Sequence, residues 1–106
     1  MSMNNTTRYY EYALRWSDYD AANAMRNPET TVTSPEPATL KQFRVTSYTV
    51  TNSLMSEDGM ILTQIVDIRY YNENNMREKQ LTDRQKWVFD PENEIWTLDG
   101  PLPSFQ

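Results

Sequence analysis

Residues 56–75 read SEDGMILTQIVDIRYYNENN, a strand pattern enclosed by two turns. Asp58-Gly59 supplies the positive φ that a tight hairpin turn needs, and residues 72–75 turn the chain again. Between these turns, residues 60–71 alternate in polarity, and Asp67 and Arg69 fall on the side away from the core. The core side carries Leu62, Val66, Ile68 and Tyr70. This stretch predicts one strand of an antiparallel sheet, paired with a neighbour across each turn.

The sequence on both sides of this strand extends the sheet. Residues 40–54 predict a strand whose apolar set changes face partway, so we expect a β-bulge near Thr46-Ser47. Residues 76–89 predict a third strand and residues 94–102 a fourth, with turns at 56–59, 72–75 and 90–93. The inward set of the last two strands is Leu81, Trp87, Phe89, Trp96 and Leu98. We therefore expect a four-stranded antiparallel meander over residues 39–102.

Residues 8–26 are aromatic and alanine-rich, with helical spacing. At about 100° per residue, one broad face carries the apolar side chains and the opposite face the charged ones. The apolar face comprises Tyr9, Tyr10, Ala13, Leu14 and Trp16. We expect Trp16 to be the main anchor of this helix on the sheet. Residues 17–20 have the form of a capping box, which predicts a kink, a second short helix to about Met25, and Asp20 at a helix end.

The 106 residues are the length of one domain. Residues 1–7 are polar and are expected to be disordered or left over from cloning. Residues 27–38 contain three prolines and predict an extended connector, too short to separate two domains. Residues 8–106 are therefore one α+β domain, in which a kinked N-terminal helical segment (8–26) packs on a curved four-stranded antiparallel sheet (39–102).

The composition excludes several classes of site. The chain has no cysteine and no histidine, which excludes thiol chemistry, histidine-based triads and nearly all zinc centres. With only two glycines, Gly-rich phosphate loops are excluded as well. The acidic turns at 57–58 and 90–92 lack the spacing of a calcium loop. We therefore predict no metal and no cofactor.

The charge balance bears on the partners that this chain can have. Ten basic and fifteen acidic residues give a net charge of −5, which works against a nucleic-acid partner. No stretch approaches the ~20 apolar residues of a membrane span. The sequence as it stands predicts a cytoplasmic protein; the alternative is a periplasmic or lipid-anchored protein whose export segment is absent from this sequence.

Two segments carry a resemblance to a known family. Residues 9–25 read YYEYALRWSDYDAANAM, and residues 84–105 read RQKWVFDPENEIWTLDGPLPSF. In this order they resemble the opening helices and closing hairpin of the nuclear transport factor 2-like superfamily, the cystatin-like α+β roll. The chain is similar to small bacterial members of unassigned role, many of them exported or lipid-anchored. It departs from fuller members in having only the proline-rich connector where a third helix would stand.

The resemblance implies where chemistry would occur. Enzymes of the superfamily, of isomerase and dehydratase type, work in the cone between sheet and helices with an acid–base residue and a hydrogen-bond donor. Tyr12, Tyr48 and Tyr70 are candidate donors here, and Asp20 and Asp67 candidate bases, although the parity of Asp67 points it away from the core. Such an enzyme needs a buried carboxyl of raised pKa near a tyrosine hydroxyl inside the cone. We assign no catalytic residue.

The aromatic residues support three interpretations: core packing alone, the wall of a ligand pocket, or a dimer face. The pocket candidates are Tyr12, Trp16, Tyr48, Tyr70, Trp87 and Trp96. The dimer candidates, on the open face of the sheet, are Ile61, Ile65, Arg69, Tyr71 and Val88. The leading hypothesis is a non-catalytic binding or assembly module that presents a pocket or sheet face to a small ligand or protein, including a second copy. A small isomerase- or dehydratase-type enzyme acting on an apolar substrate is the alternative.

Overall fold

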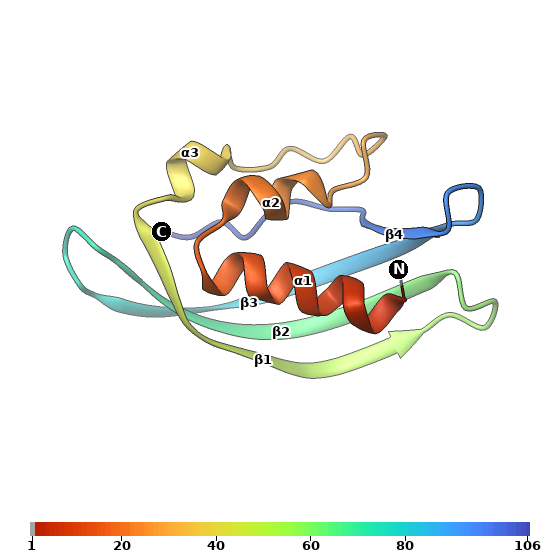
Figure 1. The fold of residues 1–106 in the computed structure, drawn as a ribbon. Helices are drawn as coiled ribbons and strands as arrows, with labels where there is room; N and C mark the ends of the chain where they lie inside the picture. The colour runs from red at the N-terminus through yellow and green to blue at the C-terminus, as the bar shows by residue number, and fades with distance from the viewer. Residues whose placement is uncertain (1) are drawn as a thin grey trace.

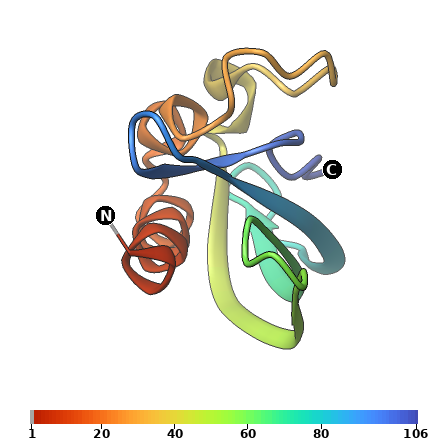
Figure 2. The same cartoon turned by 90° about the vertical axis from the view of Figure 1, so that its right-hand side faces the viewer.

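The computed structural model describes residues 2–106 and shows three helices and one four-stranded sheet. The helices are α1 (Met3–Arg15), α2 (Tyr19–Ala24) and α3 (Pro37–Leu40). The strands are β1 (Phe43–Met55), β2 (Ile61–Asn72), β3 (Glu78–Asp90) and β4 (Ile95–Leu98). The helices lie on one side of a curved, open sheet, and α1 sits within the curve with β1 on one side and β4 on the other (Figure 1, Figure 2). The α+β class and the curved antiparallel sheet are confirmed.

The strands follow the predicted order, β1-β2-β3-β4, with every neighbouring pair antiparallel. The expected bulge is present, since the register of β1 on β2 shifts between Val45 and Ser47. A second shift, which was not predicted, lies between Val50 and Asn52. These shifts keep Val45, Tyr48 and Val50 on the helix side although their spacing changes along the strand.

The fourth strand is shorter than the predicted 94–102. It ends at Leu98, because Pro101 and Pro103 follow and proline cannot donate to a strand ladder. Residues 99–106 instead run back along the helix side of the sheet and bury Leu102 and Phe105 (Figure 1). The C-terminal tail is therefore part of the core.

The first helix begins earlier than predicted, so residues 3–7 are helical and belong to the domain, where a disordered start was expected. Ser2 is the N-cap, and its hydroxyl accepts the Asn5 N–H at 3.3 Å. Thr6 is buried against the core side of the helix. A serine can cap a helix, and the short polar residues that follow it form the first turn here. The polar composition of this stretch suggested disorder instead. Met1 lies outside the described residues.

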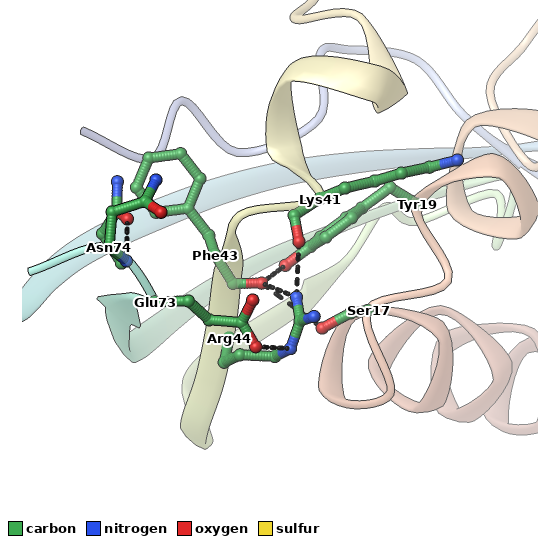
Figure 3. A network of polar contacts seen from close by, with 8 residues as sticks. Ser17, Tyr19, Lys41, Phe43, Arg44, Glu73 and Asn74 are labelled. Carbon is green, nitrogen blue, oxygen red and sulfur yellow. Dashed lines mark hydrogen bonds and ion pairs between the residues drawn. The ribbon is translucent and has the colours of Figure 1, made fainter. Parts of the chain in front are cut away.

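The kink between α1 and α2 is confirmed, but a different aspartate caps α2. Ser17 adopts a positive φ of 58°, and Asp18 is the N-cap, with its carboxylate accepting the Ala21 N–H at 3.1 Å. Asp20 lies in the first turn of α2, at a helix end as expected, but it is exposed and lies 3.5 Å from Lys41, so the prediction that it caps the helix was wrong. The hydroxyls of Ser17 and Tyr19 donate to the Phe43 carbonyl, which ties the kink to the start of β1 (Figure 3).

The buried face of α1 is rotated from the one expected. Tyr10 lies at its centre, fully buried, whereas Trp16 is 71% exposed and Tyr9 60% exposed. At about 100° per residue, Trp16 is about 120° away from Tyr10 around the helix, too far to reach the same surface. The prediction of Trp16 as the main anchor was therefore wrong. That position is taken by Tyr10, whose ring packs edge-on against Trp87 at 5.2 Å between centroids.

The connector is not wholly extended. Glu36 is extended and Pro37 opens the short helix α3, a favoured place for proline. Leu40, at its end, is buried in the core. A short third helix therefore stands where the sequence suggested none.

Candidate functional site

A polar cluster lies inside the core, between α1 and the middle of the sheet. It is built on β3, where Asp83 and Gln85 share the inward parity of Trp87 and are almost fully buried. The Gln85 amide nitrogen donates to the Asp83 carboxylate at 2.9 Å and to the Tyr48 hydroxyl at 2.8 Å. The Trp87 indole N–H donates to the Gln85 amide oxygen at 3.0 Å. Gln85 thus joins a carboxyl, a phenol and an indole in one network.

Neither Asp83 nor Gln85 stands out in the sequence, where β3 has the mixed charge of a solvated strand. The signal that points to them is parity. Residues 81, 83, 85, 87 and 89 share one face, and the apolar members of that set already predict the core. A polar residue between two core positions of the same parity is a buried polar residue, and such residues are informative.

Burial sets the protonation of this cluster. It raises the pKa of Asp83, and the hydrogen bond from Gln85 only partly opposes the rise. Burial likewise raises the pKa of the Tyr48 phenol, again against the Gln85 bond. Burial is also the main cause of the raised pKa of Tyr10, and the negative charge of Asp83 raises that pKa further. The cluster therefore favours uncharged side chains, and its carboxyl can act as an acid nearer to neutral pH than a free aspartate.

Two buried polar atoms within the described residues have no hydrogen-bond partner: the Tyr10 hydroxyl and the Gln64 amide oxygen. Gln64 lies directly across from Gln85 in the β2–β3 register, and its nitrogen donates to the Ser53 hydroxyl at 3.0 Å. An unpartnered buried polar group costs roughly 1–3 kcal/mol. A molecule that supplies a donor to Gln64 would recover that cost.

An open groove of about 280 Å³ reaches this cluster from the side of α1. Gln64 and Tyr48 line it from the sheet, beside Val50, while Arg8 and Glu11 line it from the helix. Arg8 is exposed, and Glu11 lies 3.6 Å from Arg15. The groove therefore has Gln64, with its buried unpartnered oxygen, on the sheet side and a cation and a carboxylate on the helix side.

The six predicted pocket residues do not form one pocket. Tyr48 and Trp87 belong to the polar cluster, but Tyr12 and Trp16 are exposed on the outer face of α1, where their rings lie 6.0 Å apart. Trp96 is half-buried against Phe89, at 5.3 Å. Tyr70 is buried at the far end of the core, and its hydroxyl accepts the Gln106 N–H at 3.1 Å.

The two aspartates predicted as candidate bases lie outside the polar cluster and do not line the groove. Asp20 is exposed, and Asp67 lies on the outer parity of β2, where it accepts from the Thr82 hydroxyl at 3.4 Å. In the register of β2 on β3, Asp67 lies directly across from Thr82. The buried carboxyl is instead Asp83, two hydrogen bonds away from the Tyr48 hydroxyl through Gln85.

The predicted dimer residues lie on the outer face of the sheet. Ile61 pairs with Val88 across β2 and β3, and Ile65 pairs with Arg84. Arg69 is exposed and lies 4.0 Å from Glu78, while the four apolar members of the set are half-buried. Long neighbouring side chains therefore already cover part of this face.

Residues 2–106 contain neither a metal-binding cluster nor a membrane-spanning helix. No group of three or more acidic side chains is placed to hold a metal ion. No helix is long and apolar enough to cross a membrane. Comparison with known proteins gave no match to a family model, a curated protein or a solved structure.

Proposed function

We propose that this chain is a non-catalytic binding module, which takes a small polar molecule in the groove between α1 and the sheet. The observation that carries the proposal is Gln64, a residue of the groove that is nine-tenths buried and whose amide oxygen, itself buried, has no hydrogen-bond partner. An acceptor in that position selects a ligand with a hydrogen-bond donor, because an unmade bond there is costly.

The rim of the groove narrows the class of ligand. Arg8 is exposed, and its guanidinium can pair with an anionic group. A molecule with an N–H donor at one end and a carboxylate at the other suits both features. N-acetylglycine is the simplest probe of this kind, while propionate lacks the N–H and N-methylacetamide lacks the carboxylate.

The proposal is tested by NMR titration of these three probes, following the backbone amide signals of groove residues that every variant retains, such as Arg8 and Val50. N-acetylglycine should shift them at lower concentration than either half-probe. Gln64→Leu should weaken its binding by about tenfold, the equivalent of one hydrogen bond to a buried acceptor. Gln80→Leu, at an exposed position of β3, is the matched control and should bind like the wild type. Equal shifts from all three probes, or unchanged binding by Gln64→Leu, would contradict the proposal.

A second candidate is the small isomerase- or dehydratase-type enzyme, and Asp83 favours it. A buried carboxyl of raised pKa is a suitable general acid or base, and Gln85 links it to a tyrosine hydroxyl. Asp83 does not line the groove, however, so binding remains the first proposal. Conversion of 3-cyclohexen-1-one to its conjugated isomer, followed by absorbance, tests the alternative. A rate no higher in the wild type than in Asp83→Asn would remove it.

The resemblance to the nuclear transport factor 2-like superfamily remains a prediction and supports both candidates equally. Its site, like the groove described above, would lie between the helices and the concave sheet. The two candidates therefore differ in the role of Asp83 and not in where a ligand enters.

A further inference from the structure

We propose that the free edge of β1 is an interface between two copies of this chain, which pair antiparallel about a two-fold axis and continue the sheet. This goes beyond the binding groove and differs from a dimer through the sheet face. The interface consists of residues 46–56, at the outer strand of the sheet.

The two edges of the sheet are treated differently by the fold. The β4 edge is four residues long and is covered, since the backbone of Met25 and Asn27 bonds to Leu98 on its outer side. The β1 edge is thirteen residues long, and within the described residues only its beginning is covered. There the Phe43 carbonyl accepts from Ser17 and Tyr19 (Figure 3). From about Thr46 onward the strand has a β-strand partner on one side only.

The free part of β1 lacks the residues that usually protect an edge strand. Residues 45–56 read VTSYTVTNSLMS, without a charge, a proline or a glycine. Residues 49–55 are all exposed, including the apolar side chains of Val50, Leu54 and Met55. Soluble proteins normally place lysine, proline or a short strand at such an edge to prevent pairing. The charges lie instead on β3, which carries six and which pairs with β4 only at residues 87–90. An uncharged edge of this length is suited to pairing.

Charge at the two ends of the segment selects a second copy in antiparallel orientation. The basic residues Lys41 and Arg44 lie at its start, where they form exposed or half-exposed ion pairs with Asp20 and Glu73 of the same chain, and the acidic residues Glu57 and Asp58 follow its end. An antiparallel copy places the basic end of each chain beside the acidic end of the other. A parallel copy would place like charges together, which is unfavourable for directly opposed residues.

The register of β1 on β2 fixes the position of the axis. A two-fold axis between Val50 and Thr51 sets Arg44 opposite Glu57 of the second copy. It also sets Tyr48 opposite Ser53 and Thr49 opposite Asn52. Tyr48 and Ser53 both lie on the helix side, across from Ile68 and Gln64 of β2, whereas Thr49 and Asn52 both lie on the outer side, across from Asp67 and Ile65. The Tyr48–Ser53 and Thr49–Asn52 pairs therefore each join residues on the same face, as a continuous sheet requires.

The paired residues share a face only because β1 has its second register shift, between Val50 and Asn52. Without the register shift between Val50 and Asn52, one of the two halves of the segment would present its opposite face. The same pairing brings Ser53 of the second copy beside Tyr48, at the open side of the groove. The dimer would thus extend the floor of the groove.

Sedimentation equilibrium, from micromolar to submillimolar concentration, tests the proposal. The wild type should pass from 12.5 kDa to twice that mass, about 25 kDa. Val50→Lys places a lysine on each side of the axis and should remain at the monomer mass with an unchanged circular dichroism spectrum. Val32→Lys, at an equally exposed valine in the connector, should dimerise like the wild type.

A second pair of variants tests how much charge contributes to the stability of the dimer. Glu57→Lys opposes Arg44 of the second copy and should weaken the dimer about threefold to tenfold, since two such contacts form about the axis. Glu92→Lys makes the same change in the turn between β3 and β4 and should have no such effect. A wild-type mass that stays at 12.5 kDa would overturn the proposal. A dimer that survives Val50→Lys but is lost in Ile65→Lys would also overturn it, because the interface would then be the sheet face.

Discussion

Trp87 donates its indole N–H to the amide oxygen of Gln85, two residues earlier on the same face of β3, at 3.0 Å. Both side chains are buried, so this bond fixes the orientation of the Gln85 amide. With its oxygen occupied by Trp87, Gln85 presents its nitrogen to Tyr48 and Asp83. The largest core side chain thereby positions the polar cluster beneath the groove.

Replacing Gln85 with leucine should destabilise the protein by about 3 kcal/mol or more. The change leaves the Trp87 indole, the Tyr48 hydroxyl and the Asp83 carboxyl buried without this partner, and each such loss costs roughly 1–3 kcal/mol. Urea unfolding measures the difference. Gln80→Leu, on an exposed part of the same strand, should change the free energy of unfolding by less than about 0.5 kcal/mol. A similarly small effect for Gln85→Leu would show that the network is not formed.

Asp83→Asn should make the protein more stable at pH 7. Burial raises the folded-state pKa of Asp83 above its unfolded value, so the folded state loses stability as the pH rises through the folded pKa. The asparagine does not ionise and avoids this loss. Below the unfolded pKa of about 4 both forms are neutral, and the advantage of the variant should disappear. Urea unfolding of both proteins at pH 7 and pH 3.5 checks the sign; an advantage of equal size at both pH values would contradict it.

Trp16→Ala should change the free energy of unfolding by less than about 0.5 kcal/mol, as surface substitutions do. The ring is 71% exposed on the outer side of the α1 terminus. Trp87→Ala is the contrasting variant, and emptying that fully buried position should cost about 3–5 kcal/mol. Thermal or urea unfolding decides. A large loss for Trp16→Ala would mean that this ring is buried, as the sequence alone had suggested.

Asp18 and Asp20 offer a matched pair for the kink. Asp18→Ala removes the cap of α2 and should cost about 1 kcal/mol. Asp20→Ala removes only an exposed ion pair with Lys41, which is worth little. Asp18→Ala should therefore lower the measured free energy of unfolding by more than Asp20→Ala does. Equal losses would place the cap elsewhere.

The sheet could be predicted from the sequence because its signals are local. The Asp58-Gly59 turn and the alternation of β2 depend on neighbouring residues only, and both agree with the structure. The helix face was harder, because Tyr9, Tyr10 and Trp16 are all large and apolar. Which of them faces the core depends on how α1 meets β3, and this is a tertiary contact that the helical period does not encode.

The candidate site could be predicted only in part, for a related reason. Tyr48 and Trp87 were among the expected pocket residues, but Asp83 and Gln85 have the same residue types as the exposed positions around them. Their burial follows from the strand parity of Trp87 combined with the position of α1 above the sheet. The groove itself depends on the distance between α1 and β1, which arises from packing over the whole core.

A crystal structure of the free protein, at a resolution that shows ordered water, tests the central claim most directly. The claim is that Gln64 presents an unpartnered acceptor to an open groove. It predicts a bound water or small molecule in the groove, within about 2.7–3.2 Å of the Gln64 amide oxygen. The contradicting result is a groove closed by α1, with a protein donor bonded to that oxygen.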